Sequence, residues 1–243
     1  MPGWDLASCV RALGLVERYP WLDAAVGVHP HDAAGATDAD WTAIVALAGD
    51  ERVVAVGETG LDFDRLFSPV EAQLTNLRRN LALAMELGKP AILHCRSAAG
   101  MRDAQDALLA ELHAAGIGGP STAGFGERPA AVVHSYSGPV DYAEAVLALG
   151  LAVSFSGLVF RPGEEASAEV ARLVPADRLL VETDSPFLSP PGAPRRRNEP
   201  EWVAVTARWL ANRRSEPPDL VGDRLVGAYD RTFERRTRSL DTN

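Results

Sequence analysis

The sequence predicts an α/β protein in which repeated strand and helix units build a parallel sheet. Three observations support this prediction. Short apolar runs alternate with longer amphipathic segments along all 243 residues, each run is nearly continuous in apolar residues, and polar residues follow the runs directly. Ligands of parallel α/β proteins bind at the carboxyl ends of the strands, so we expect the functional site there.

Six apolar runs are the candidate strands, and their continuous apolar character is typical of parallel strands that are buried on both faces. They are Ala24 to Val28, Val53 to Gly57, Ala91 to His94, Ala131 to His134, Leu151 to Phe155, and Leu179 to Glu182. No repeat of fixed period or low-complexity tract interrupts the alternation. We therefore expect residues 1–243 to form a single domain.

The helix after the second run has the clearest local signals. Ser68, Pro69 and Glu71 predict an N-cap, a first-turn proline and a capping box, and Gly88 predicts the end of the helix after Leu87. We expect further helices over residues 99–115, 199–213 and 220–236, and a loop over the Gly- and Pro-rich residues 116–129.

The charge of the chain limits how it could bind a polyanion. The sequence has 24 Lys and Arg against 33 Asp and Glu, a net charge of -9, which excludes generic electrostatic binding to DNA. A phosphate-bearing substrate must then be held locally, either by bound cations or by a basic loop such as Arg195, Arg196 and Arg197.

The two cysteines, Cys9 and Cys95, are too few for a disulfide framework or a zinc ribbon, and a reducing compartment fits best. The N-terminus lacks a signal-peptide pattern, and no apolar stretch approaches the roughly 18 residues that span a bilayer. We expect a cytoplasmic protein with no membrane association and no stable protein partner.

Four residues, each at the end of a different apolar run or just beyond it, are the candidate metal ligands: Glu58, His94, His134 and Asp184. A lone histidine at a strand end is usually structural, but four coincidences on four strands favour convergence on a metal. Imidazole with carboxylate and no thiolate suits Zn²⁺, Mn²⁺, Co²⁺ or Mg²⁺, as one ion or two. Glu58 could bridge two ions, and Asp184 could act as a general base towards a metal-activated water.

Three further residues are expected to line the substrate pocket. Arg96 lies two residues after His94, so in a continuing strand it faces the same side and could clamp a phosphate, although a surface ion pair is the alternative. His29 and His31 flank Pro30 after the first run, and a solvent-facing turn is the alternative for His31.

The segments GVHPHD, VGETGLDFDR, PAILHCRSA, VHSYSG, LLVETDSPFL and RRNEP resemble, in order and spacing, the signature segments of the TatD family of metal-dependent deoxyribonucleases. The resemblance implies a TIM-type (β/α)8 barrel of the metal-dependent hydrolase kind, divalent metal ions, and hydrolysis of phosphodiester bonds in DNA. It also implies that Glu58 is a bridging ligand, that His94 and His134 bind one metal, and that Asp184 binds the other and helps to activate water.

The sequence departs from the family at its beginning, because the family starts with a strand carrying D-x-H-x-H, a helix and a second strand. We therefore expect an incomplete barrel without strands one and two, with unpaired edges on its first and last strands, from a misassigned start or a truncated gene. His29 and His31 could replace the missing histidines, but the family keeps their segment too, which favours pocket lining. Two alternatives remain open: hydrolysis of another ester or amide, and a catalytically inactive family member.

Overall fold

The computed structural model describes residues 1–194 and 197–234, and six parallel strands form its single sheet in the order β1-β2-β3-β4-β5-β6. The strands are β1 (Ala24–Val26), β2 (Val53–Asp62), β3 (Ala91–Arg96), β4 (Ala131–Val133), β5 (Ala152–Phe155) and β6 (Leu179–Val181). The α/β class and the six predicted strands are confirmed. Within the described residues β1 and β6 do not pair with each other, so the sheet is not closed.

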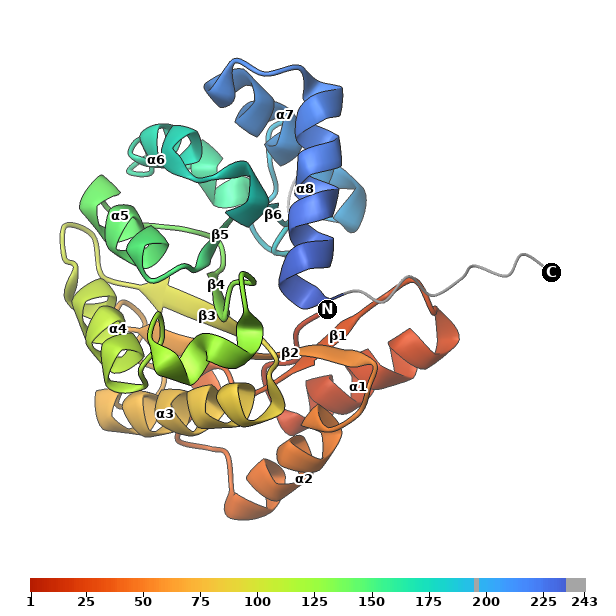
Figure 1. Cartoon of the computed structure of the whole chain (residues 1–243), viewed down its shortest axis with the longest axis vertical. Coiled ribbons are helices and arrows are strands. Elements are labelled where there is room, and N and C mark those ends of the chain that lie inside the picture. The colour runs from red at the N-terminus through yellow and green to blue at the C-terminus, as the bar shows by residue number, and fades with distance from the viewer. Residues whose placement is uncertain (195–196, 235–243) are drawn as a thin grey trace.

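Helices surround the strands, and Figure 1 shows them on the outside of the sheet. They are α1 (Leu6–Arg18), α2 (Asp38–Ala48), α3 (Val70–Leu87), α4 (Asp103–Ala114), α5 (Val140–Ala148), α6 (Ser167–Leu173), α7 (Val203–Arg214) and α8 (Pro218–Phe233). Short 3-10 turns are η1 (Pro30–Asp32), η2 (Pro120–Phe125), η3 (Gly157–Phe160), η4 (Ala176–Arg178) and η5 (Pro200–Trp202). None of the helices in the described ranges is both long and apolar enough to cross a membrane.

Helix α3 ends as predicted but begins differently. Gly88 follows its last residue with a φ of 61°, the left-handed conformation that glycine adopts at low cost. The predicted N-cap at Ser68 is wrong, because α3 has no side-chain cap. The Ser68 hydroxyl instead donates to the His31 carbonyl at 2.8 Å and accepts the Ala34 N–H at 3.1 Å. This serine therefore ties the loop before α3 to the turn η1.

Strand β2 is longer than predicted, because pairing with β3 continues beyond Gly57 as far as Asp62. The register of the two strands shifts between Val56 and Thr59, on either side of Glu58. Gly60 has a φ of 135°, and a Cβ there would clash with the backbone carbonyl of His94. Glycine at this position thus allows the Glu58 strand to approach the His94 strand closely.

Two contacts cover the outer side of β1. Residues 1–3 run beside this strand, with the Gly3 N–H bonded to the Ala25 carbonyl at 2.9 Å and the Ala25 N–H bonded to the Met1 carbonyl at 3.0 Å. The Tyr229 hydroxyl of α8 donates to the Asp23 carboxylate at 2.9 Å, which brings the end of α8 beside the start of β1 (Figure 1). The expectation of an unpaired edge at β1 is therefore wrong.

Candidate metal centre

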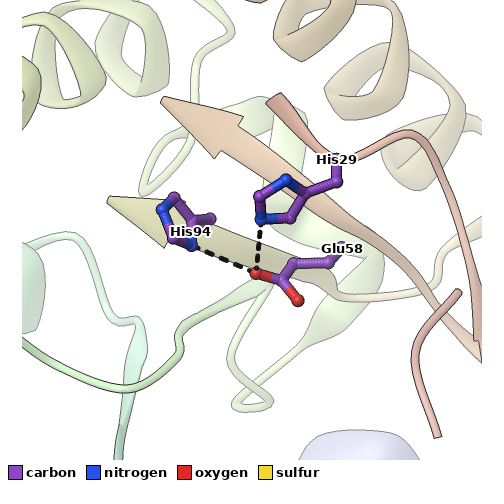
Figure 2. Close-up of side chains that lie close together, drawn as sticks. All are labelled: His29, Glu58 and His94. Carbon is purple, nitrogen blue, oxygen red and sulfur yellow. Dashed lines mark hydrogen bonds and ion pairs between the residues drawn. The ribbon is translucent and has the colours of Figure 1, made fainter. Parts of the chain in front are cut away.

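One carboxylate oxygen of Glu58 lies at the centre of a group of imidazoles. Glu58 Oε1 is 2.6 Å from His134 Nε2, 3.2 Å from His94 Nδ1 and 3.3 Å from His29 Nε2. Figure 2 shows His29 and His94 pointing towards this carboxylate. Glu58 comes from β2, His94 from β3, His134 from just after β4, and His29 from the segment between β1 and η1. Residues that are far apart in the sequence thus meet where they lie on four neighbouring strands or just beyond them.

Two further carboxylates contact the same histidines from outside this group. Asp62 Oδ2 is 3.2 Å from His94 Nε2 and 2.8 Å from His31 Nε2, and Glu182 Oε1 is 3.1 Å from His134 Nδ1. The sequence did not lead us to predict Glu182 as a site residue, and it did not predict a contact between Asp62 and a histidine. The period of two along a strand could have found Asp62, which lies four residues after Glu58 in β2, whereas Glu182 lies beyond the end of β6.

Asp184 follows β6 and lies close enough to the cluster for their charges to interact. Its backbone φ is 56°, a left-handed value that aspartate tolerates better than most residues, and its carbonyl accepts the Phe187 N–H at 2.8 Å. Burial raises the pKa of Asp184 to about 6; the charge of His134 opposes this shift, and the charge of Glu182 adds to it. Its carboxylate makes no hydrogen bond to the described residues, so its oxygens remain available.

Burial would raise the pKa of Glu58, but the charge of His134 and hydrogen bonds from three imidazoles hold this pKa well below its usual value. Burial would lower the pKa of His134, but Glu58 and Glu182 raise it well above its usual value. The pKa of His94 is raised in the same way by Asp62 and Glu58, whereas burial lowers the pKa of His29. Without a cation, the lowered pKa of Glu58 and the raised pKa values of His134 and His94 favour an ionised carboxylate paired with protonated imidazoles.

The donor set fits a divalent cation. One ligand atom each from His29, Glu58 and His94 lies within 4.8 Å of the others. Carboxylate with imidazole and no thiolate suits Zn²⁺, Mn²⁺ or Co²⁺, and histidine favours these ions over Mg²⁺. Because imidazoles bind metals in the deprotonated form, a cation that entered the site would release protons from the histidines.

The structure places the other predicted residues around this centre. Arg96 is about half exposed and forms an ion pair with Asp64, with Nε 2.8 Å from Oδ2. The ring of His31 packs edge-on against Phe67, with ring centroids 4.7 Å apart. Arg197 pairs with Glu199 at 2.6 Å, and Arg195 and Arg196 lie outside the described residues. Arg96 thus has the ion pair that was the alternative to a phosphate contact.

Comparison with known proteins agrees with this geometry. The family model described as TatD related DNase matches residues 1–234. A protein of Erwinia billingiae named 3'-5' ssDNA/RNA exonuclease TatD is 40% identical over 229 residues, which cover 90% of this chain and 81% of that protein. A Bacillus subtilis protein named uncharacterized metal-dependent hydrolase YabD is 34% identical over 86% of this chain and 76% of its own length.

The crystal structure of YjjV, a TatD homologue from Escherichia coli K12, superimposes with a TM-score of 0.83 at 29% identity. The match covers 97% of this chain and 86% of YjjV, so the strand order and the helices outside it are shared over almost the whole described fold. The chain belongs to the TatD-related DNase family, and its parallel sheet has the TIM-barrel-like fold of these hydrolases.

Proposed function

We propose that this protein is a metal-dependent hydrolase that cleaves phosphodiester bonds in single-stranded nucleic acid, with DNA as its substrate. The observation that carries the proposal is the position of Glu58 Oε1, which lies within 3.3 Å of imidazole nitrogens from three separate parts of the chain. Family membership and the name of the Erwinia relative, 3'-5' ssDNA/RNA exonuclease TatD, support the reaction and the substrate class.

Glu58, His94, His134 and Asp184 are the proposed metal-binding residues. A bound divalent cation would acidify a water molecule and polarise the phosphoryl group. Glu58 keeps a negative charge in a partly buried position, because its low pKa leaves it ionised at neutral pH. Asp184 is the proposed general base: its carboxylate makes no hydrogen bond to the described residues, so one of its oxygens can accept a proton from the attacking water.

His29, His31 and Arg96 are the proposed substrate-binding residues. The net charge of the chain is -9, so the phosphate of the substrate needs local donors. The ion pair between Arg96 and Asp64 is partly exposed and therefore weak, and a phosphate can replace Asp64 as the partner of the guanidinium.

We also propose that the chain is one domain that works in the cytoplasm. The main apolar core runs from Cys9 to Leu225 without a break between separate cores of similar size, which supports one domain. Cys9 and Cys95 are free and buried, as is usual for proteins of a reducing compartment.

The test is a paired hydrolysis assay on the purified chain with Mn²⁺, Co²⁺, Zn²⁺ or Mg²⁺ added, or with EDTA. A 5'-labelled single-stranded DNA oligonucleotide and an acyl ester are the two substrates. We expect shortening of the DNA with a cation and none with EDTA. Cleavage of the ester without cleavage of the DNA would instead assign another substrate class.

Two variants give the assay its controls. Glu58→Gln has nearly the same shape as the native residue but loses the charge, and we expect it to lose both cation binding and turnover. Glu144→Gln makes the same chemical change on the exposed face of α5 and should leave both unchanged. Equal turnover of the two variants would contradict the proposal.

A further inference from the structure

Each imidazole near Glu58 has a second nitrogen that faces away from this carboxylate, and the partner of that outer nitrogen decides where the ring carries its proton. His94 directs Nδ1 at Glu58 and Nε2 at Asp62, with both distances 3.2 Å. His134 directs Nε2 at Glu58, at 2.6 Å, and Nδ1 at Glu182, at 3.1 Å. An ionised carboxylate only accepts hydrogen bonds, so each of these rings can donate an N–H to its outer carboxylate as well as to Glu58. When a cation takes the place of the inner proton, the outer N–H stays on its carboxylate, and the inner nitrogen offers the lone pair that a metal ligand requires.

His29 has the opposite arrangement. Its Nδ1 accepts the backbone N–H of His31 at 3.1 Å, so the lone pair of Nδ1 is already used. In the neutral ring the proton must then be on Nε2, the nitrogen that lies 3.3 Å from Glu58. His29 is as close to Glu58 as His94 is, yet its neutral ring presents an N–H to the site, whereas the neutral ring of His94 can present a lone pair there.

We propose that Asp62 and Glu182 are positioning residues that hold His94 and His134 as metal ligands, and that the backbone of His31 holds His29 as a hydrogen-bond donor. The inference rests on the proposed metal site and deepens it. By distance alone His29 would count as a ligand, because its ligand atom, like those of Glu58 and His94, lies within 4.8 Å of the others. The hydrogen bonds of the outer nitrogens distinguish His29 from His94. When a cation neutralises Glu58, the N–H of His29 becomes free to donate to a phosphoryl oxygen of the substrate.

Asp62 is well suited to fix the orientation of a ring. Its side chain is 1% exposed, and its second oxygen, Oδ1, accepts the N–H groups of Asp64 at 3.1 Å and Arg65 at 2.8 Å. The buried side chain of Gln73 holds the Asp62 backbone from α3, accepting its N–H at 2.7 Å and donating to its carbonyl at 3.0 Å. Both oxygens and the backbone of Asp62 are thus held, so the carboxylate cannot turn away from His94.

Glu182 is held less firmly, since its side chain is 26% exposed and one oxygen contacts His134. Loss of the Glu182 carboxylate should therefore weaken the site less than loss of the Asp62 carboxylate. This ranking is a consequence of the hydrogen bonds around the two acids, and a purely electrostatic role would not predict it.

The experiment is a Co²⁺ titration of the metal-free chain without nucleic acid, followed by the visible absorption of bound cobalt. We expect His94→Gln and His134→Gln to lose binding, and His29→Gln to keep an affinity within about twofold of the native value with the same spectrum. Asp62→Ala should weaken binding by about 10- to 100-fold, with a smaller loss for Glu182→Ala. Asp62→Asn should recover part of the loss, because its amide oxygen can still accept the N–H of His94. Asp64→Asn is the matched control, since Asp64 contacts Arg96 and no histidine, and should bind cobalt normally.

Two outcomes would overturn the inference. A loss of cobalt binding in His29→Gln as large as that in His94→Gln would make His29 a ligand. Normal binding by Asp62→Ala would remove the positioning role, and Asp62→Asn, which preserves the size of the side chain, separates this role from a failure to fold. The outcomes are independent of the nuclease assay. If cobalt binding follows the expected ranking but DNA is not cleaved, the proposed function fails and the sorting of the histidines stands.

Discussion

Replacement of Asp184 by Asn should stabilise the metal-free protein, but only at a pH above the usual carboxyl pKa of 3.8. The folded protein raises the pKa of this carboxyl from 3.8 to about 6, mainly through burial, so the folded state disfavours the carboxylate. Between these two pH values the folded state binds more protons than the unfolded state, and stability falls as the pH rises. Above about pH 7 the cost is constant at up to about 3 kcal/mol, since a tenfold change in acidity corresponds to about 1.4 kcal/mol.

Asp184→Asn removes this cost because the amide is neutral at every pH, and asparagine also tolerates the left-handed backbone of this residue. In EDTA, the variant should match the native chain near pH 4 and exceed it above pH 7. Partial exposure of the side chain reduces the gain, so we expect about 1–3 kcal/mol, or about 2–10 °C in melting temperature for a chain of this size.

The assay is thermal unfolding in EDTA across this pH range, with Glu144→Gln as the control for loss of an exposed carboxylate. With saturating Co²⁺ the sign should reverse, because the cation favours the ionised form and the variant lacks a ligand. A variant that is less stable than the native chain in EDTA at pH 7.5, or a difference that does not change with pH, would refute the reasoning.

Three other perturbations have definite expected outcomes. Gly60→Ala should destabilise the fold by more than about 2 kcal/mol in denaturant unfolding, because the new Cβ clashes with the backbone of His94. Gly88→Ala has open space around its new Cβ and should cost about 1 kcal/mol. Equal losses would contradict the packing argument. Arg96→Ala should raise KM for single-stranded DNA by about tenfold or more with little change in kcat and in stability, and an unchanged KM would remove its role with substrate. The affinity for Co²⁺ should rise with pH as the pH passes the raised pKa of His94, because the metal binds the deprotonated ring. Calorimetry in two buffers of different ionisation enthalpy should detect the released protons. An affinity that does not change with pH would exclude protonated histidines in the metal-free site.

The sequence allowed a correct prediction of the alternating strands, because buried parallel strands are apolar along their whole length. It failed at the end of β2, where Glu58 to Asp62 break the apolar pattern with polar residues and glycine. Pairing with β3 keeps these residues extended, and a sequence pattern does not contain that information. Polar strand ends are therefore where this kind of prediction stops too early, and here the extension carries Asp62 into contact with His94.

The predicted N-cap at Ser68 illustrates a second limit. The pattern of Ser68, Pro69 and Glu71 has the residue types of a helix start, but the hydroxyl of Ser68 finds partners in the turn η1, more than 30 residues earlier in the chain. Local propensity cannot anticipate a competing partner that the fold brings close. The same limit applies to His31, whose partner Asp62 is 31 residues away.

The site combines carboxylates, which attract a cation, with imidazoles, which repel a cation when they are protonated. The protonation of the imidazoles therefore controls cation binding. In the metal-free state the raised pKa values of His94 and His134 favour protonated rings paired with the ionised Glu58, so ion pairs within the cluster stabilise it. A divalent cation would supply the same positive charge in place of the inner protons, and Asp62 and Glu182 would keep the rings in their orientation. The side chains of the centre can therefore hold this arrangement before a metal binds. A cation then has to displace protons from the histidines but does not have to order the chain.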